Sequence, residues 1–174
     1  MQWRKRGHIF APGGELWWAR SYATLPTVTQ RGEELRIYFA ALDDQRRGRL
    51  GFVDVLATDP SRLLRVGQEP LLDLGAPGLF DDCGVNPSCL ISVNGRQRLY
   101  YIGWQRCEAV PYMLFAGVAE AADDDRFRRL SLVPVLDRTP EEPFLRSAIS
   151  VLAEDGGFRA WYVSAERWID VAGS

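Results

Sequence analysis

An internal repeat of about 60 residues limits the folds open to this chain more than any other feature of its sequence. Three aromatic-rich segments recur, and their tyrosines are about 63 and 61 residues apart. Two shorter markers repeat at a similar spacing, 70–73 with 134–137 and 51–54 with 117–120. Three independent markers at one period indicate repeated structural units. The aromatic segments are 35–41, 98–104 and 158–164, aligned on Tyr38, Tyr101 and Tyr162.

Each unit reads as four strands, because β-branched and aromatic residues fill the runs and turn residues such as Asn94-Gly95 separate them. Four antiparallel strands at this period are typical of a β-propeller blade. The sequence therefore predicts an all-β fold, with one blade at about 21–66, a second at about 80–131 and the start of a third at about 144–174. The strands expected in the two full blades are 26–29, 35–41, 49–55 and 63–65, then 87–93, 98–104, 114–120 and 127–130.

The predicted third blade stops after its second strand, whereas a propeller needs at least four blades to close. Three explanations stay open at this point. The chain is part of a longer gene product, or it closes with a partner such as a second copy of itself, or its fold is an open variant. In each case an incomplete blade leaves an unpaired strand edge, which invites association.

The charge balance argues against several partners. Lysine and arginine number 21 and aspartate and glutamate 23, so the formal net charge is −2, which does not favour binding to a phosphate backbone. The basic start of the chain is not followed by the apolar stretch of a signal peptide, and no run approaches the length of a membrane span. With three cysteines, this pattern predicts a reduced, cytoplasmic protein that contacts neither nucleic acid nor membrane. A zinc site would have to combine Cys83, Cys89, Cys107 and His8, which lack the usual close cysteine pair.

Several stretches resemble the five-bladed β-propeller glycosidase-like superfamily. They are 80–88 (Phe-Asp-Asp-Cys-Gly-Val-Asn-Pro-Ser), 99–104 (Leu-Tyr-Tyr-Ile-Gly-Trp), 134–138 with 141–143, and 161–164. That superfamily includes invertases, arabinanases, xylosidases and β-mannoside phosphorylases, and the nearest likeness is to an uncharacterised glycosidase-like branch. The resemblance covers nearly all of this chain but only the first half of the family's length. It implies a propeller of the five-bladed type, with about two and a half blades of four-stranded antiparallel sheet present.

The resemblance also implies an active site at the narrow end of a central tunnel, where acids from successive inner strands meet. Glycoside cleavage needs one carboxylic acid to protonate the leaving oxygen and one carboxylate to activate water or attack the sugar. Where hydrolases of the superfamily commonly carry acids, this chain has Leu25, Asn86 and Ala148. The candidate catalytic residues that remain are Asp82 as the acid, and Asp81 and Glu142 for the second carboxylate.

A second set of residues is expected to bind substrate. Asn86 suits a sugar hydroxyl, and the face of Trp104 beside Arg106 suits stacking on a pyranose and contact with an anionic substituent. Each candidate has a structural alternative: the two aspartates also suit turn caps, Glu142 a solvated loop, Asn86 an Asx turn and Trp104 core packing. The full predicted set of substrate-binding residues is Asn86, Trp104, Arg106 and Arg138.

The leading functional prediction is a carbohydrate-active protein that hydrolyses or phosphorolyses a glycosidic bond without a metal or organic cofactor. The alternatives are a non-catalytic glycan-binding or interaction propeller, and an inactive fragment of a longer glycosidase-like protein. Residues outside the site have simpler interpretations. The repeated tyrosines are expected in the core, Arg36 and Arg159 as solvated strand charges, and the basic run 46–49 in an exposed hairpin turn.

Overall fold

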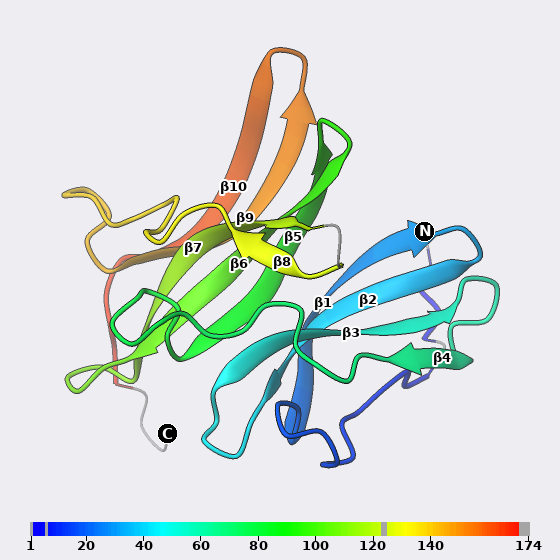
Figure 1. Ribbon diagram of the computed structural model, residues 1–174. Coiled ribbons are helices and arrows are strands. Elements are labelled where there is room, and N and C mark those ends of the chain that lie inside the picture. The colour runs from blue at the N-terminus through cyan, green and yellow to red at the C-terminus, as the bar shows by residue number, and fades with distance from the viewer. Residues whose placement is uncertain (1, 6, 123–124, 171–174) are drawn as a thin grey trace.

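The computed structural model describes residues 2–5, 7–122 and 125–170, and these residues form ten β-strands and no helix (Figure 1). The prediction of an all-β chain is therefore confirmed. The strands are β1 (Ser21–Arg31), β2 (Glu34–Leu42), β3 (Gly48–Leu56), β4 (Leu63–Val66), β5 (Gly84–Val93), β6 (Arg96–Arg106), β7 (Tyr112–Ala121), β8 (Phe127–Arg129), β9 (Leu145–Glu154) and β10 (Gly157–Ala165).

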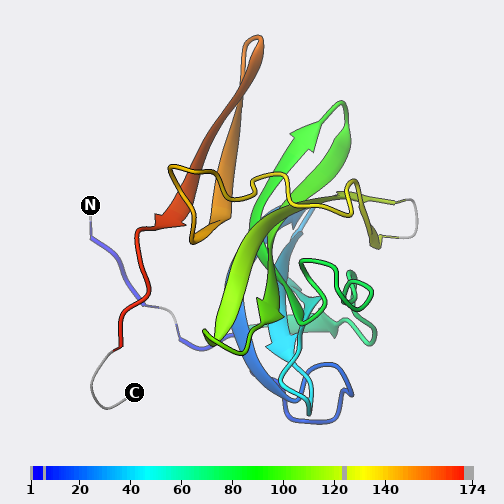
Figure 2. The ribbon, with the colours of Figure 1, turned by 90° about the vertical axis from the view of Figure 1, so that its left-hand side faces the viewer.

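The strands form three consecutive antiparallel units. The first unit is β1–β4, the second unit is β5–β8, and the third unit is the β9–β10 hairpin. Single parallel bridges join neighbouring units, Gly48 to Gly84 and Phe115 to Arg146. The first strand of each unit contacts the first strand of the next, β1 with β5 and β5 with β9, so these are the inner strands of the assembly. Figure 2 shows the third unit projecting beyond the other two.

Burial explains why the two middle strands of the first unit are so apolar. Most of β2 and nearly all of β3 are buried, because both of their faces are covered. Three apolar clusters provide this cover. One lies between the first and second units around Tyr38, Phe80 and Tyr101, and a smaller one joins the second unit to the third around Ile149. On the opposite side of the first unit, the segment before β1 closes the sheet with the buried indole of Trp18.

The repeat markers of the sequence occupy equivalent places in the sheet. Leu72 bridges to Leu50 in the first unit, and Leu136 bridges to Ala116 in the second. Gly51 and Gly117 also correspond, because each lies opposite an aromatic residue of the preceding strand.

These pairs correct the alignment of the tyrosines. Gly51 lies opposite Phe39, whereas Gly117 lies opposite Tyr101, so Phe39 rather than Tyr38 corresponds to Tyr101. Tyr38 and Tyr101 are buried as expected, but Tyr162 is 39% exposed. The expectation of a core position is wrong for Tyr162, because the third unit has no further strands to cover it among the described residues.

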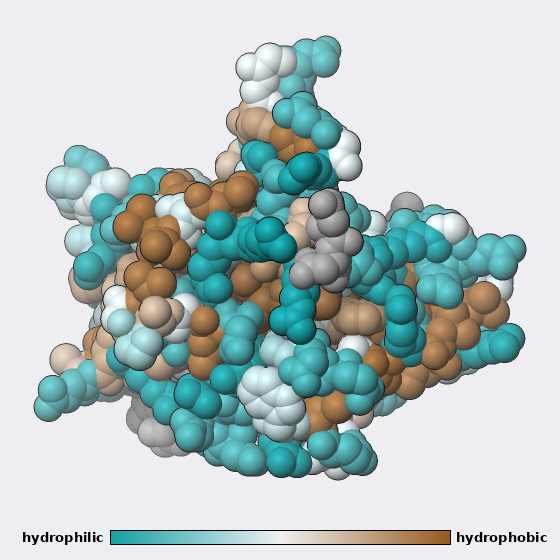
Figure 3. Space-filling view, viewed as in Figure 1, coloured by the Kyte–Doolittle hydropathy of each residue, from teal (hydrophilic) through white to brown (hydrophobic). Residues whose placement is uncertain are grey.

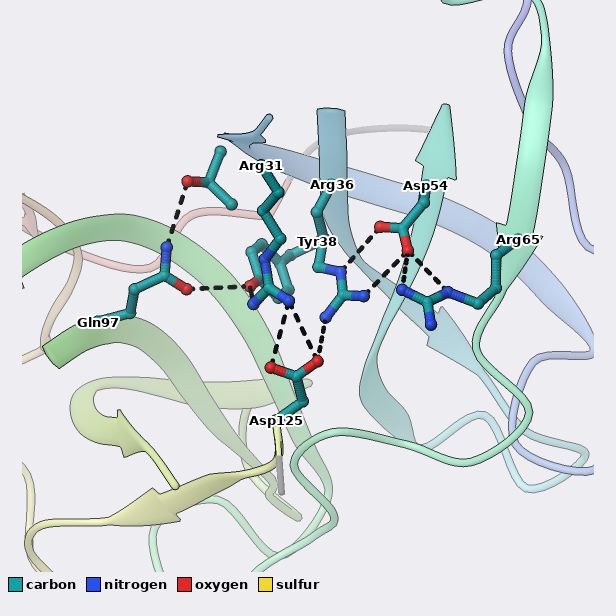
Figure 4. Close-up of polar contacts among 8 residues, drawn as sticks. Arg31, Arg36, Tyr38, Asp54, Arg65, Gln97 and Asp125 are labelled. Carbon is teal, nitrogen blue, oxygen red and sulfur yellow. Dashed lines mark hydrogen bonds and ion pairs between the residues drawn. The ribbon is translucent and has the colours of Figure 1, made fainter. Parts of the chain in front are cut away.

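A buried ionic network connects the first and second units (Figure 4). The Arg36 guanidinium donates to both carboxylate oxygens of Asp54, at 2.8 and 2.9 Å, and both side chains are 1% exposed. Arg65 donates to the same carboxylate at 2.8 Å. Asp125, in the turn before β8, accepts from Arg36 at 3.0 Å and so ties the second unit to the first. The interpretation of Arg36 as a solvated charge is therefore wrong, whereas Arg159 is exposed beside Glu154.

The basic run at the β2–β3 turn is only partly exposed. Arg49 is 5% exposed, and its guanidinium donates to Asp43 at 2.5 Å and to Asp73 at 2.6 Å. The same guanidinium lies 4.9 Å from the ring centre of Trp17. The expected hairpin turn is present, but Arg49 at its end is a buried structural residue rather than a solvated one.

Two further observations concern a metal site and a membrane span. Within the described ranges, no three or more histidine, cysteine, aspartate or glutamate side chains gather in a way that would hold a metal ion. Cys83 and Cys89 are partly buried, Cys107 is exposed, and all three are free thiols. No helix long and apolar enough to cross a membrane is present in the part of the chain that the structure describes.

Candidate functional site

The candidate residues lie at one end of the sheet, which we call the mouth. Here the inner strands β5 and β9 begin, β6 ends, and the 43–47 turn and the 67–83 and 130–144 loops meet them. Cys83 and Gly84 are fastened to Trp104 at the end of β6 by backbone pairing. The mouth therefore collects residues that are far apart in the sequence.

Asn86 and Trp104 come together at the mouth. Both side chains pack against Gly48: a Cβ atom on this glycine would lie 2.9 Å from Asn86 Oδ1 and 3.3 Å from Trp104 Nε1. A Cβ on Gly84 would lie 1.7 Å from the same indole nitrogen, so both glycines are needed to admit the indole. Asn86 Oδ1 is buried and has no hydrogen-bond partner among the described residues. An unsatisfied buried acceptor beside an indole is an arrangement that a hydroxyl ligand would complete.

Arg106 extends this cluster toward the first unit. Its Nη2 donates to the carbonyl oxygens of Gln45 and Arg46, the second at 3.0 Å, and its guanidinium lies 6.0 Å from the ring centre of Trp104. The predicted pairing of Trp104 with Arg106 is thus present in space. Part of the hydrogen-bonding capacity of Arg106 is already used to hold the β2–β3 turn.

Asp81 points away from solvent into the contact between units. It is 0% exposed, and its Oδ2 accepts from the hydroxyl of Tyr101 and from Nε of Arg129, both at 2.8 Å. Burial, followed by the neighbouring Asp81 carboxylate, raises the pKa of Tyr101, which keeps the phenol a donor. This arrangement fastens the 67–83 loop to β6 and β8, and it gives Asp81 a structural task.

Asp82 organises the same loop from its outer side. Its Oδ2 accepts from the N–H of Gly78 at 2.8 Å, and its own N–H donates to the carbonyl of Leu79. The other carboxylate oxygen, Oδ1, is buried and unpartnered among the described residues. Burial raises the pKa of the adjacent Cys83 thiol, with a further contribution from Asp82. Asp82 therefore combines a turn-capping role with one free oxygen.

Glu142 is held as a carboxylate at the entrance to the third unit. Hydrogen bonding from Ser164 lowers the pKa of Glu142, and the Tyr162 hydroxyl, which donates at 2.9 Å, and Arg146 at 3.0 Å act in the same direction. It borders an open cavity of about 540 Å³ with Pro140, Phe144 and Ala165. Arg146, which lies at the start of β9, escaped the sequence analysis because no short motif surrounds it.

Arg138 lies on the exposed part of the 130–144 loop. Its Nε is 3.9 Å from the carboxylate of Asp137, its own neighbour in sequence. No contact brings it to Asn86, Trp104 or Arg106 among the described residues. The structure thus unites three of the four predicted substrate-binding residues.

The inner-strand positions also need a correction of register. Each inner strand carries an irregularity in pairing, and Leu25 and Ala148 adopt positive φ values of 54° and 49° there. The pairs on either side align Asn86 with Thr24 and Ser147, not with Leu25 and Ala148. None of these positions carries an acid, so the corrected register leaves the inner strands equally poor in carboxylates at the mouth.

Comparison with known sequences finds uncharacterized mycobacterial proteins. No family model matches the chain. It is 40% identical over 169 residues to "Uncharacterized protein Rv1502" and "Uncharacterized protein MT1551" of two strains of Mycobacterium tuberculosis. The match covers 97% of this chain and 56% of each relative. The chain therefore spans about half the length of the curated relatives it matches.

Comparison with solved structures decides the fold. The crystal structure of α-L-arabinofuranosidase from Lactobacillus brevis superimposes with a TM-score of 0.69 over 98% of this chain and 52% of that one. The chain has the fold of the glycosidase-like β-propellers. Zg3597, a family 117 glycoside hydrolase of Zobellia galactanivorans, agrees at a TM-score of 0.58 over 92% of the chain. Sequence identities of 19% and 16% make this a likeness of fold, which does not by itself assign an activity.

Proposed function

We propose that the mouth binds a carbohydrate, with Asn86 and Trp104 as the principal contacts and Arg106 beside them. The observation that carries this proposal is the buried, unpartnered Oδ1 of Asn86, which packs against Gly48 together with the indole nitrogen of Trp104. A sugar hydroxyl both donates and accepts, so one hydroxyl satisfies the amide oxygen and accepts from the indole. The fold likeness to glycoside hydrolases supports this ligand class.

The binding test measures affinity for a panel of methyl glycosides and arabino-oligosaccharides by titration calorimetry. Asn86→Leu removes the acceptor, and Trp104→Phe retains an aromatic ring but removes the N–H. We expect each to weaken binding about tenfold or more, since a lost hydrogen bond to a buried partner costs about 1–3 kcal/mol. Trp17→Phe, on an exposed ring outside the Asn86–Trp104 pair, is the matched control and should bind normally. Unchanged affinity in both mouth variants would contradict the proposal.

A second candidate is cleavage of the bound glycoside by hydrolysis or phosphorolysis. Asp82 and Glu142 are the two acids that favour it, because Asp82 keeps a free buried oxygen and Glu142 is maintained as a carboxylate. In an inverting reaction, Asp82 would protonate the leaving oxygen while Glu142 activates water or positions phosphate. Asp81 is not part of this scheme, since it is fully buried and its Oδ2 forms an ion pair with Arg129 and accepts from Tyr101.

Turnover of nitrophenyl glycosides, with and without phosphate, separates cleavage from binding alone. If the chain cleaves glycosides, Asp82→Asn should reduce kcat by at least about a hundredfold while glycan affinity stays within a few-fold, since general acid catalysis contributes this much. Asp137→Asn is a control carboxylate on the exposed loop. Absence of turnover in the unmodified chain, together with normal binding, would leave the binding role as its function.

A further inference from the structure

The turn between β2 and β3, residues 43–47, is held by one of its own side chains. Asp43 is 6% exposed, and its Oδ1 accepts from the backbone N–H groups of Gln45 at 2.8 Å and Arg47 at 2.9 Å. Its Oδ2 accepts from the guanidinium groups of Arg47 at 3.0 Å and Arg49 at 2.5 Å. The backbone of Asp43 also closes the turn, since it accepts from the N–H of Arg46 and donates to the carbonyl of Arg47. Asp43 therefore determines the shape of this turn.

Polar contacts, rather than apolar packing, keep the turn in one conformation. Figure 3 shows a mostly hydrophilic surface over this end of β2 and β3, at the lower edge of the view. Arg46 has a positive φ of 57°, which costs free energy in a residue with a Cβ atom and persists where the surrounding contacts impose it. Burial alone would raise the pKa of Asp43, but hydrogen bonds from Arg47 and Arg49 outweigh it, so the pKa lies below its ordinary value. Asp43 is therefore a carboxylate at neutral pH and accepts all of these contacts.

The same turn presents two of its carbonyl groups to the second unit. The carbonyls of Gln45 and Arg46 accept from Nη2 of Arg106. The guanidinium of Arg106 in turn lies 6.0 Å from the ring centre of Trp104 at the mouth. These two carbonyls are the acceptors that the described part of the chain offers to this guanidinium, and both belong to the turn that Asp43 shapes. The position of the turn therefore sets the position of Arg106.

We propose that Asp43 is a positioning residue for the carbohydrate site: by shaping the turn, it fixes the two carbonyls that hold Arg106 beside Trp104. This inference rests on the proposed function of the mouth. A guanidinium that is held in place before binding loses less conformational freedom when a ligand contacts it, and the smaller loss raises affinity. Asp43 itself is buried and acts through the backbone of the turn.

The glycan affinity of folded variants, measured by titration calorimetry, is the first test. Asp43→Asn removes the charged acceptor of the turn, and we expect it to weaken binding about two- to tenfold, because Arg106 must then be ordered on binding. Asp44→Asn is the matched control: this neighbouring carboxylate is 75% exposed and lies 3.4 Å from Arg20, so affinity should not change. Circular dichroism confirms that both variants are folded, which separates positioning from a loss of stability. Normal affinity in a folded Asp43→Asn variant would overturn the proposal.

A double-mutant cycle tests whether Asp43 acts through Arg106. In an Arg106→Gln background the guanidinium is already absent, so Asp43→Asn should weaken binding by less than about twofold. An equal effect of Asp43→Asn in both backgrounds would overturn the route through Arg106. Asp43→Ser replaces the asparagine variant if a buried amide prevents folding, because serine keeps a short but weaker acceptor for the N–H groups of the turn. The same outcomes apply to it.

The variant Asn86→Leu separates this inference from the proposed function. If Asn86→Leu weakens binding and Asp43→Asn does not, the positioning role is overturned and the carbohydrate site stands. If the mouth binds no glycan, urea denaturation of the unmodified chain, the two single variants and the double variant tests the contact without ligand. We expect the effects of Asp43→Asn and Arg106→Gln on stability to be non-additive, whereas additive effects would overturn the placement of Arg106 by Asp43.

Discussion

At the scale of single residues, the buried ion pair of Arg36 and Asp54 is the contact whose loss should lower stability most. Both side chains are almost fully excluded from water, and the carboxylate accepts from two guanidinium groups. A buried charge is tolerated only while its partner is present. Burial alone would raise the pKa of Asp54, but the hydrogen bonds from Arg36 and Arg65 outweigh it, and the pKa lies below its ordinary value.

Replacing Asp54 with Asn should destabilise the fold by about 3–5 kcal/mol, because Arg36 then keeps a buried charge with a weakened partner. Urea denaturation at pH 7 measures the free energy of unfolding. Glu154→Gln, which removes an exposed partner of Arg159, is the control and should change it by less than about 1 kcal/mol. Similar losses in both variants would show that burial of the pair does not matter.

The same carboxyl group gives a pH dependence of known sign. Since the pKa of Asp54 is lower in the folded state, its contribution to stability is complete above the unfolded pKa of about 3.9. The contribution is lost as the pH falls through the folded value. Urea midpoints measured from pH 7 down to pH 3 should therefore decline in the acid range, and decline less steeply in Asp54→Asn. Parallel curves for the two proteins would contradict this assignment.

At the scale of strands, close packing of aromatic rings on glycine fixes how β3 and β7 sit against their neighbours. A Cβ on Gly51 would lie 1.8 Å from the Trp18 ring, and one on Gly117 would lie 2.2 Å from the Tyr101 ring. Neither glycine has an unusual φ, so the requirement is space and not backbone freedom. The repeat of these glycines in the sequence was therefore a packing signal.

Gly51→Ala and Gly117→Ala should each destabilise the chain by about 1–3 kcal/mol, since an inserted methyl forces a buried ring to move. Gly157→Ala, at a strand position with no atom within 4 Å of the new Cβ, is the control and should be neutral or slightly stabilising. Thermal denaturation followed by circular dichroism compares the three. An effect in the control as large as in the other two would argue against the packing explanation.

The strand pattern was predictable from sequence, whereas the register was not. Alternating apolar runs and turn residues predicted the eight strands of the first two units and a pair of strands in the third, because these signals are local. The one-residue offset of Tyr38 from Tyr101 appears only in the cross-strand partners of Gly51 and Gly117, which an alignment of the sequence on its tyrosines does not contain. The burial of Arg36 and Arg49 was missed for a related reason: their partners Asp54 and Asp73 are distant in sequence.

At the scale of the whole molecule, stability is unevenly distributed over the three units. The first two share a continuous apolar cluster and the ionic network, while the third is a hairpin whose second strand is almost wholly exposed. Local opening follows the extent of burial. Of the candidate site, the sequence proposed Asn86, Trp104 and Arg106 as substrate-binding residues. It had no means of separating Asp81, which is fully buried and paired with Arg129, from Asp82, which is only partly buried.

Hydrogen exchange at low protein concentration should therefore show amides of β10 exchanging first and those of β2, β3, β6 and β7 last. Mass spectrometry of peptides resolves these segments. Protection of β10 equal to that of β6 in the monomer would contradict the uneven distribution.

The contact of Arg106 with the β2–β3 turn has a thermodynamic consequence. This side chain belongs to the second unit, yet it holds two carbonyl groups of the first, beside the ring of Trp104. A ligand that orders this guanidinium also opposes separation of the two units, so occupancy and cohesion are linked. The reciprocal also holds: weakening the contact between the two units lowers the affinity for the ligand. A sugar bound at the mouth would therefore stabilise the contact between the first and second units.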